Sequence, residues 1–220
     1  MKLSKRTFEI LKNFAIINNS IFFDEEGVIK TMSLAGNIIA VADIEEKIPT
    51  FGIWNLPEFL GTVSLFDLEQ TEFEFEEKLV KIKCGRRSFK YIYTSMDLLP
   101  CFGKIKPAEK YRVFDKFNST FALSEDDISI LRKASSIMKL THIDVKLKDK
   151  TGIIRVSDDN ASASNTFKID IEGDGDCEIA FNVDNLILVN GNYKVSVCDK
   201  KLIKFLRDDQ KIFYFISPTV

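Results

Sequence analysis

The 220-residue sequence is poor in the residues on which most catalytic and metal sites depend. It has one histidine, His142, four dispersed cysteines without a CxxC pair, and neither a GxxxxGK[ST] nor a GxGxxG phosphate-binding loop. No apolar run approaches the roughly 20 residues of a membrane helix, and the charged N-terminal segment is unlike a secretory signal. We therefore expect no catalytic residues, metal, cofactor or membrane association, and a cytoplasmic protein with reduced thiols.

The charge balance limits how the chain could bind nucleic acid. With 31 Lys and Arg against 33 Asp and Glu, the formal net charge is −2. This argues against a protein that binds nucleic acid with its whole surface. The 45% hydrophobic content is typical of a globular chain, long enough for one large or two modest domains.

The acidic run 170–178 (DIEGDGDCE) is the most tempting cation site. Apolar residues alternate on both sides of it, which predicts two strands rather than the helices that flank a helical calcium loop. We expect a hairpin turn in which Gly173 and Gly175 adopt positive φ. His142 lies in another alternating run and is expected to be structural or exposed.

The most informative pattern is a strand–helix–three-strand unit that occurs four times. Helices are expected from residue 4 to about 17, from 55 to about 66, from 124 to about 140, and over 183–189. Ser4, Asn55 and Ser124 are the expected N-caps of the first three helices. Strands are expected at 1–3, 20–24, 27–33, 37–44, 48–54, 71–76, 79–84, 88–93, 119–123, 142–148, 151–157, 165–172, 177–182, 192–198, 202–207 and 211–217.

The four units group into two similar domains. The segment before 115 has two prolines, a glycine and no strand periodicity, as expected for an extended connector. We predict domains at 1–97 and 115–220 joined by a connector at 98–114. The fold class is α+β, with helices on one face of largely antiparallel sheets.

Two of the helices have basic outer faces although the chain is net negative. Opposite their apolar stripes, the first and third helices carry a cationic surplus, whereas the second and fourth do not. A solvated face is the plain alternative, but the coincidence at equivalent positions of two repeated domains favours a DNA-facing surface. The candidates are Lys2, Lys5, Arg6, Lys12, Arg132, Lys133 and Lys139.

Several strings resemble the sliding clamp of T-even-type bacteriophages, the processivity factor of the phage DNA polymerase. They are MKLSK and LKNFAIIN near the start, FLGTVSLF (59–66) and NGNYKVSV (190–197). The likeness is densest at 1–23, 55–66 and 181–198 and thin at 67–120 and after 199. It implies the DNA-clamp fold and a non-enzymatic homotrimeric ring that encircles double-stranded DNA, tethers the replicative polymerase, and is opened by a separate ATP-dependent clamp loader.

The resemblance also implies a groove for partner peptides beside the connector. Leu98, Leu99, Phe102 and Ile105 are the connector candidates, and Phe215, Ile216 and Pro218 at the C-terminal strand are expected to border the same groove. The alternative is that these residues merely anchor the connector to its domain. Subunits are expected to join through exposed sheet edges, for which 86–93 and 165–172 are candidates.

Two other classes remain open from the residues alone. A β-rich phage structural or assembly protein with two similar domains would bind only protein. An enzyme acting on nucleic acid would need clustered carboxylates or histidines, which the sequence does not suggest.

Overall fold

The computed structural model describes residues 1–158, 165–198 and 202–219, which form two compact units, Met1–Val113 and Phe114–Val220. None of the helices within these residues is long and apolar enough to cross a membrane.

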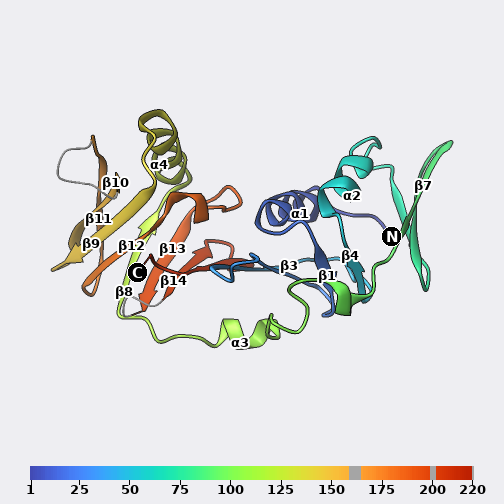
Figure 1. Ribbon diagram of the computed structural model, residues 1–220, viewed down its shortest axis with the longest axis horizontal. Coiled ribbons are helices and arrows are strands. Elements are labelled where there is room, and N and C mark those ends of the chain that lie inside the picture. The colour runs from blue at the N-terminus through green and yellow to red at the C-terminus, as the bar shows by residue number, and fades with distance from the viewer. Residues whose placement is uncertain (159–164, 199–201, 220) are drawn as a thin grey trace. The chain divides into compact units, whose positions relative to one another are not determined.

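The first unit places two helices on one face of an antiparallel sheet (Figure 1). The sheet has the strand order β3-β2-β1-β4, and a second sheet has the order β5-β6-β7. The elements are α1 (Lys5–Ile17), β1 (Ile21–Phe23), β2 (Val28–Met32), β3 (Ile38–Asp43), β4 (Phe51–Ile53), α2 (Leu56–Val63), β5 (Glu72–Phe75), β6 (Leu79–Cys84), β7 (Arg87–Ile92), the 3-10 helix η1 (Met96–Leu98) and α3 (Ala108–Arg112).

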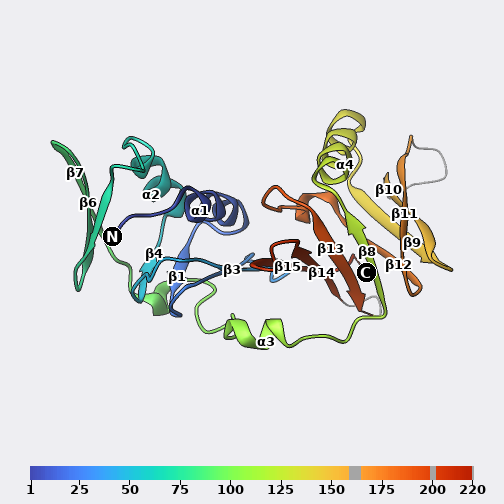
Figure 2. The same ribbon diagram turned by 180° about the vertical axis from the view of Figure 1, so that it is seen from behind.

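The second unit repeats this plan with one long helix over an antiparallel sheet of order β12-β9-β10-β11-β8-β13-β14-β15 (Figure 2). Its elements are β8 (Ser119–Leu123), α4 (Glu125–Met138), β9 (His142–Lys148), β10 (Thr151–Ser157), β11 (Phe167–Asp174), β12 (Cys177–Asn182), the 3-10 helix η2 (Val183–Asn185), β13 (Tyr193–Cys198), β14 (Leu202–Arg207) and β15 (Ile212–Ile216). The predicted α+β class with helices on antiparallel sheets is confirmed.

The predicted caps of the three longer helices are confirmed. Ser4 Oγ accepts the N–H of Thr7 at 3.1 Å, and Asn55 Oδ1 accepts that of Glu58 at 3.2 Å. Ser124 and Asp127 form a reciprocal capping box. Each helix then buries one apolar stripe, which in α1 includes Ile10, Leu11 and Phe14. The direction of this stripe determines which residues of each helix face solvent.

The helix predicted over 183–189 is wrong. Only Val183–Asn185 forms a single 3-10 turn, and residues 186–191 form a loop with bends at Asn190 and Gly191. In this loop Leu186 and Leu188 are buried while Ile187 and Val189 are half-buried, which is the period of two of extended chain. The β-branched residues of the segment also disfavour a short helix. Within the described residues three of the four expected helices are therefore present, and a loop stands in place of the fourth.

Two smaller expectations also change. Residues 1–3 are not a strand, although Met1 exchanges backbone hydrogen bonds with Phe73 of β5 at 2.7 and 2.8 Å. In the acidic hairpin only Gly175 has positive φ, at 77°. Gly173 lies in β11, where an added Cβ would be 2.3 Å from the Thr120 carbonyl oxygen. Glycine is therefore needed at position 173 because β11 and β8 approach closely there, and not because of turn geometry.

Glu46 ties the start of α1 to the loop after β3. Its carboxylate accepts the Ser4 N–H at 2.5 Å and the Thr7 hydroxyl at 2.6 Å. Partial burial by itself raises the pKa of Glu46, but these hydrogen bonds outweigh it and the net pKa is lowered.

We predict that Glu46→Gln lowers the free energy of unfolding at pH 7 by about 1 kcal/mol. Because the folded pKa is depressed, the carboxylate stabilises the fold above its unfolded pKa of about 4.3, and this contribution disappears as pH falls through the folded value. Urea unfolding from pH 7 to pH 3 should show the gap between wild type and variant closing. The exposed neighbour Glu45 serves as control, since Glu45→Gln should leave stability unchanged at every pH; a constant gap for Glu46→Gln would contradict the assignment.

Candidate nucleic-acid interface

The outer face of α1 carries cations that are already paired. Lys5 Nζ lies 2.5 Å from a Glu69 carboxylate oxygen, and Lys2 Nζ donates to the Glu69 carbonyl at 2.7 Å. The Lys5–Glu69 hydrogen bond and its charge attraction raise the pKa of Lys5 and lower that of Glu69. Lys12 Nζ pairs with Glu9 at 2.9 Å.

These ion pairs are solvent-exposed and therefore weak. Both side chains of the Lys5–Glu69 pair are mostly exposed. An exposed pair of this kind contributes about 0–1 kcal/mol and is screened by salt. The lysines could exchange their carboxylate partners for phosphate at little cost.

Arg6 lies on the flank of α1 rather than on its outer face. Its Nη1 donates to the Asp43 carbonyl at 2.7 Å, and the side chain is half-buried. Asp43 also accepts a hydrogen bond from Arg112 through its carboxylate. Arg6 therefore links α1 to β3, and its side chain is less accessible than those of Lys5 and Lys12.

The outer face of α4 is basic at its C-terminal half. Lys133 is exposed between Ser129 and Ser136, and Lys139 follows the helix in the left-handed conformation with φ 56°. Glu125 and Asp126 occupy the first turn, where carboxylates complement the helix dipole. Positive charge on this helix is thus confined to its last two turns.

Arg132 is held by the backbone of its own unit. Its Nε donates to the Leu186 carbonyl at 2.9 Å, and Nη2 donates to the same oxygen and to Leu188 at 3.3 Å. Burial lowers the pKa of this guanidinium. Arg132 therefore supports the loop 186–191 that replaces the expected helix.

The middle and the end of α4 expose an apolar pair on the flank opposite Arg132. Ile130 is 45% exposed and Ile137 is 80% exposed, and at 100° per residue they lie on one line of the helix. We did not single them out from the sequence, although their spacing of seven residues is the signal that would have found them. Together they form an apolar strip on the surface of the second unit.

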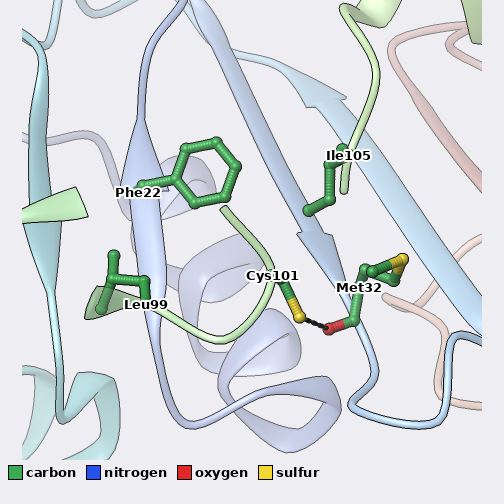
Figure 3. Packing of buried hydrophobic residues seen from close by; sticks show 5 residues of the cluster. All are labelled: Phe22, Met32, Leu99, Cys101 and Ile105. Carbon is green, nitrogen blue, oxygen red and sulfur yellow. Dashed lines mark hydrogen bonds between the residues drawn. The ribbon is translucent and has the colours of Figure 1, made fainter. Parts of the chain in front are cut away.

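The connector is packed onto the first unit through a small apolar cluster. Leu99, Cys101 and Ile105 are buried together with Phe22 of β1 and Met32 of β2 (Figure 3). Leu99 fills the space above Gly52, where an added Cβ would lie 2.8 Å from its Cδ1.

Polar contacts hold the same segment. Cys101 Sγ donates to the Met32 carbonyl at 3.2 Å, and burial raises the pKa of the thiol. Glu25 accepts the Ala108 N–H at 3.2 Å and pairs with the buried Lys30 at 2.6 Å.

The candidate groove residues divide into buried and accessible sets. Leu99 is 4% exposed, and Ile105, Phe215 and Ile216 are equally buried, the last two in β15 of the second unit. Leu98 is 65% exposed, Phe102 is 37% exposed and packs edge-on against Phe22, and Pro218 is half-buried. Of the seven candidates, only Leu98, Phe102 and Pro218 have side chains exposed enough for a partner to contact.

Each unit also has a strand edge without a partner among the described residues. In the first unit β7 pairs only with β6. In the second, β11 pairs with β10 along most of its length but reaches β8 only at Gly173 and Asp174. The backbone groups of 167–172 on that side are therefore open within the described part of the chain.

The acidic hairpin forms no metal site. Within the described residues no group of three or more His, Cys, Asp or Glu side chains is placed to hold an ion. Asp176 instead accepts the Asp149 N–H at 3.2 Å, and Glu178 pairs with Lys146 at 2.7 Å.

No known protein-family profile matches the chain. Among curated proteins, it is 31% identical to the sliding clamp of Vibrio phage KVP40 over 99% of this chain and 98% of that protein. It is 26% identical to the sliding clamp of Enterobacteria phage T4, over 89% of this chain and 86% of that one, and also 26% identical to that of Escherichia phage RB69, over 99% and 96%.

Solved structures with the same fold include clamps from bacteria and archaea. The PCNA of A. fulgidus, bound to the C-terminal region of FEN-1, superposes with a TM-score of 0.71 at 13% identity, over 97% of this chain and 94% of that one. A putative DNA polymerase III beta subunit from Eubacterium rectale gives 0.70 at 17% identity, over 99% of this chain. The chain spans 64% of that longer subunit.

Proposed function

The chain belongs to the sliding-clamp family of T-even-type bacteriophages, and from this membership we propose that three copies form a closed ring around duplex DNA and tether the replicative polymerase. The 31% identity to a phage sliding clamp over nearly the full length carries the proposal. The ring would be opened by a separate ATP-dependent loader and would act in the cytoplasm of the host bacterium.

The proposed mechanism is topological. A closed ring stays on the duplex because it is threaded, so each contact with DNA needs little affinity. Strong phosphate contacts would hold it in place, because every neutralised phosphate releases counterions and raises a salt-sensitive affinity. Lysines that exchange a weak carboxylate partner for phosphate suit this requirement. Lys2, Lys5, Lys12, Lys133 and Lys139 are the proposed contacts, and Lys5 and Lys12 are the ones with carboxylate partners. Arg6 is proposed to support α1, and Arg132 is proposed to support the loop 186–191 while its Nη1 stays available to a phosphate.

We predict that the triple variant Lys5→Glu, Lys12→Glu, Lys133→Glu reduces clamp-dependent polymerase run length roughly tenfold at moderate salt, because reversed charges repel phosphates. The readout is product length in a primer-extension assay with polymerase and loader.

A matched control carries Lys47→Glu, Lys83→Glu and Lys148→Glu. All three lysines are exposed, and Lys47 and Lys83 have carboxylate partners as Lys5 and Lys12 do. The net charge of the two variants is equal, so equal run lengths would show that the α1 and α4 lysines do not face DNA.

The two open strand edges are proposed to form the subunit interface. A strand edge pairs readily with the edge of another chain. The edge of β7 and its turn are basic, with Arg86, Arg87 and Lys90, whereas the open segment of β11 carries Asp170 and Glu172 beside a single Lys168. Apolar side chains accompany both edges: Ile92 on β7 is 74% exposed, and Ile130 and Ile137 lie on α4, which packs against β10 and β11.

We predict that wild-type protein scatters light as a particle of about 75 kDa, three times the mass of the 25.1 kDa chain. Ile92→Asp and Ile137→Asp should each shift it toward the single-chain mass, because a charge would be buried in the interface. Leu34→Asp, at an equally exposed leucine in the β2–β3 turn, is the control and should leave the mass unchanged. A wild-type particle of one chain at high concentration would contradict the ring.

The partner groove is proposed to use the exposed part of the connector. Leu98 and Phe102 stand outside the buried cluster that Leu99 and Ile105 join. The proposed occupant is the C-terminal peptide of the polymerase. The other candidates, Phe215, Ile216 and Pro218, belong to the second unit.

We predict that Leu98→Ala and Phe102→Ala weaken binding of that peptide roughly tenfold, as expected for loss of apolar anchors. Neither should lower the free energy of unfolding by more than about 1 kcal/mol. Leu99→Ala should instead cost about 3 kcal/mol of stability, because it empties a buried site. Calorimetric titration and urea unfolding separate the roles, and unchanged peptide affinity in both Leu98 and Phe102 variants would exclude these residues from the groove.

A phage structural protein is the alternative class. Such a protein would give no increase in polymerase run length with the loader present, which the same primer-extension assay measures.

A further inference from the structure

A cleft of about 210 Å³ lies on the outer side of the second unit. Its α4 wall is formed by Ser129, Arg132 and Lys133, and its opposite wall by Asn190 and Gly191 of the loop 186–191. Glu125 lies at the end of the cleft nearest the start of α4. The cleft is present because a loop stands where the repeat pattern predicts a helix.

Arg132 brings to this cleft a positive charge that forms no ion pair within the described residues. Its hydrogen-bond acceptors, the Leu186 and Leu188 carbonyls, are neutral, and within the described residues no carboxylate pairs with it. These bonds use Nε and Nη2, so Nη1 is left to donate elsewhere. A half-buried guanidinium without an anion is unusual, because buried charges are normally paired.

The opposite wall is held rigidly. The Val189 N–H donates to Tyr214 Oη at 3.1 Å, and Tyr193 Oη donates to the Val189 carbonyl at 2.6 Å. Gly191, with φ 146°, lies so close to Arg207 that an added Cβ would be 2.6 Å from its Nε. That Nε is buried and has no partner within the described structure. The loop is therefore preorganised, with a second guanidinium directly behind it.

We propose that this cleft binds a backbone phosphate of the encircled duplex. The Arg132 guanidinium, the Lys133 ammonium and the Ser129 hydroxyl supply donors from one side, and the Asn190 amide supplies them from the other. The inference rests on the proposed function, which turns the outer face of α4 toward DNA. It adds a preorganised phosphate site to a surface that otherwise carries exposed lysines.

The phosphate site belongs to the second unit only. At the equivalent position of the first unit α2 forms a regular helix, with Glu58 in its first turn. Each subunit would thus offer DNA one preorganised phosphate contact in addition to the exposed lysines of α1, and this contact reads no base edge because phosphates carry no sequence information.

The test is an amide NMR titration of the intact protein with a short duplex and, separately, with inorganic phosphate. Both probes should shift the Asn190 and Gly191 resonances. Asn190→Asp, which adds a negative charge with almost no change of shape, should weaken duplex binding roughly fivefold. Lys194→Gln, at an exposed lysine of β13 outside the cleft, should leave the Asn190 and Gly191 shifts unchanged.

Three outcomes would overturn the proposal. They are a duplex titration that leaves Asn190 and Gly191 unmoved, equal affinity for wild type and Asn190→Asp, and stronger shifts with an acidic peptide than with duplex, which would make the cleft a protein-binding site. Polymerase run length, measured in parallel, distinguishes a failure of the phosphate site from a failure of the proposed ring function. Normal clamp-dependent run length with no cleft shifts rejects the phosphate site alone, whereas no run-length increase with wild-type protein rejects the ring function itself.

Discussion

The burial of one apolar stripe of each long helix against an antiparallel sheet is the constraint on which the other features depend. Once Ile10, Leu11 and Phe14 pack inward, the positions of Lys5 and Lys12 on the outer line of α1 follow from helix geometry alone. The same holds for α4, where burial of Ile128 and Leu131 divides the remainder into a basic outer line and an apolar flank. On α4 the exposed Lys133, the exposed isoleucines and the Arg132 side chain that binds the loop 186–191 therefore lie on separate lines of the helix.

Much of this arrangement could be predicted from the sequence, because burial has a clear period in this chain. Alternating apolar residues located the strands of both units to within a few residues, and Ser4, Asn55 and Ser124 marked three helix starts. The helix predicted over 183–189 is wrong because a short run of leucine, isoleucine and valine is equally compatible with a buried helix and with extended chain. Its alternating burial became evident only with the loop packed against Tyr193 and Tyr214.

The roles of single cations could not be predicted in the same way. Arg132 and Lys133 are neighbours with the same charge, yet one is bound to the carbonyls of a distant loop and the other is exposed. Which of the two reaches solvent depends on where Leu186 and Leu188 lie, more than fifty positions later in the chain. The same is true of Leu98 and Leu99, since only the slot above Gly52 distinguishes the anchoring leucine from the exposed one. Periodicity reports which face is buried, but not which partner a long side chain finds.

The two open edges differ from each other, one being basic on β7 and the other acidic on β11, and this has a consequence for assembly. Unlike edges favour head-to-tail association, in which every copy uses one edge to hold the next. The number of copies that closes a circle is then determined by the angle between successive copies and not by how tightly the edges bind. In the proposed ring, substitutions that weaken the edges should shorten the lifetime of the closed state without changing its number of copies. A bend in the backbone near β11 would instead change that number or leave the assembly open.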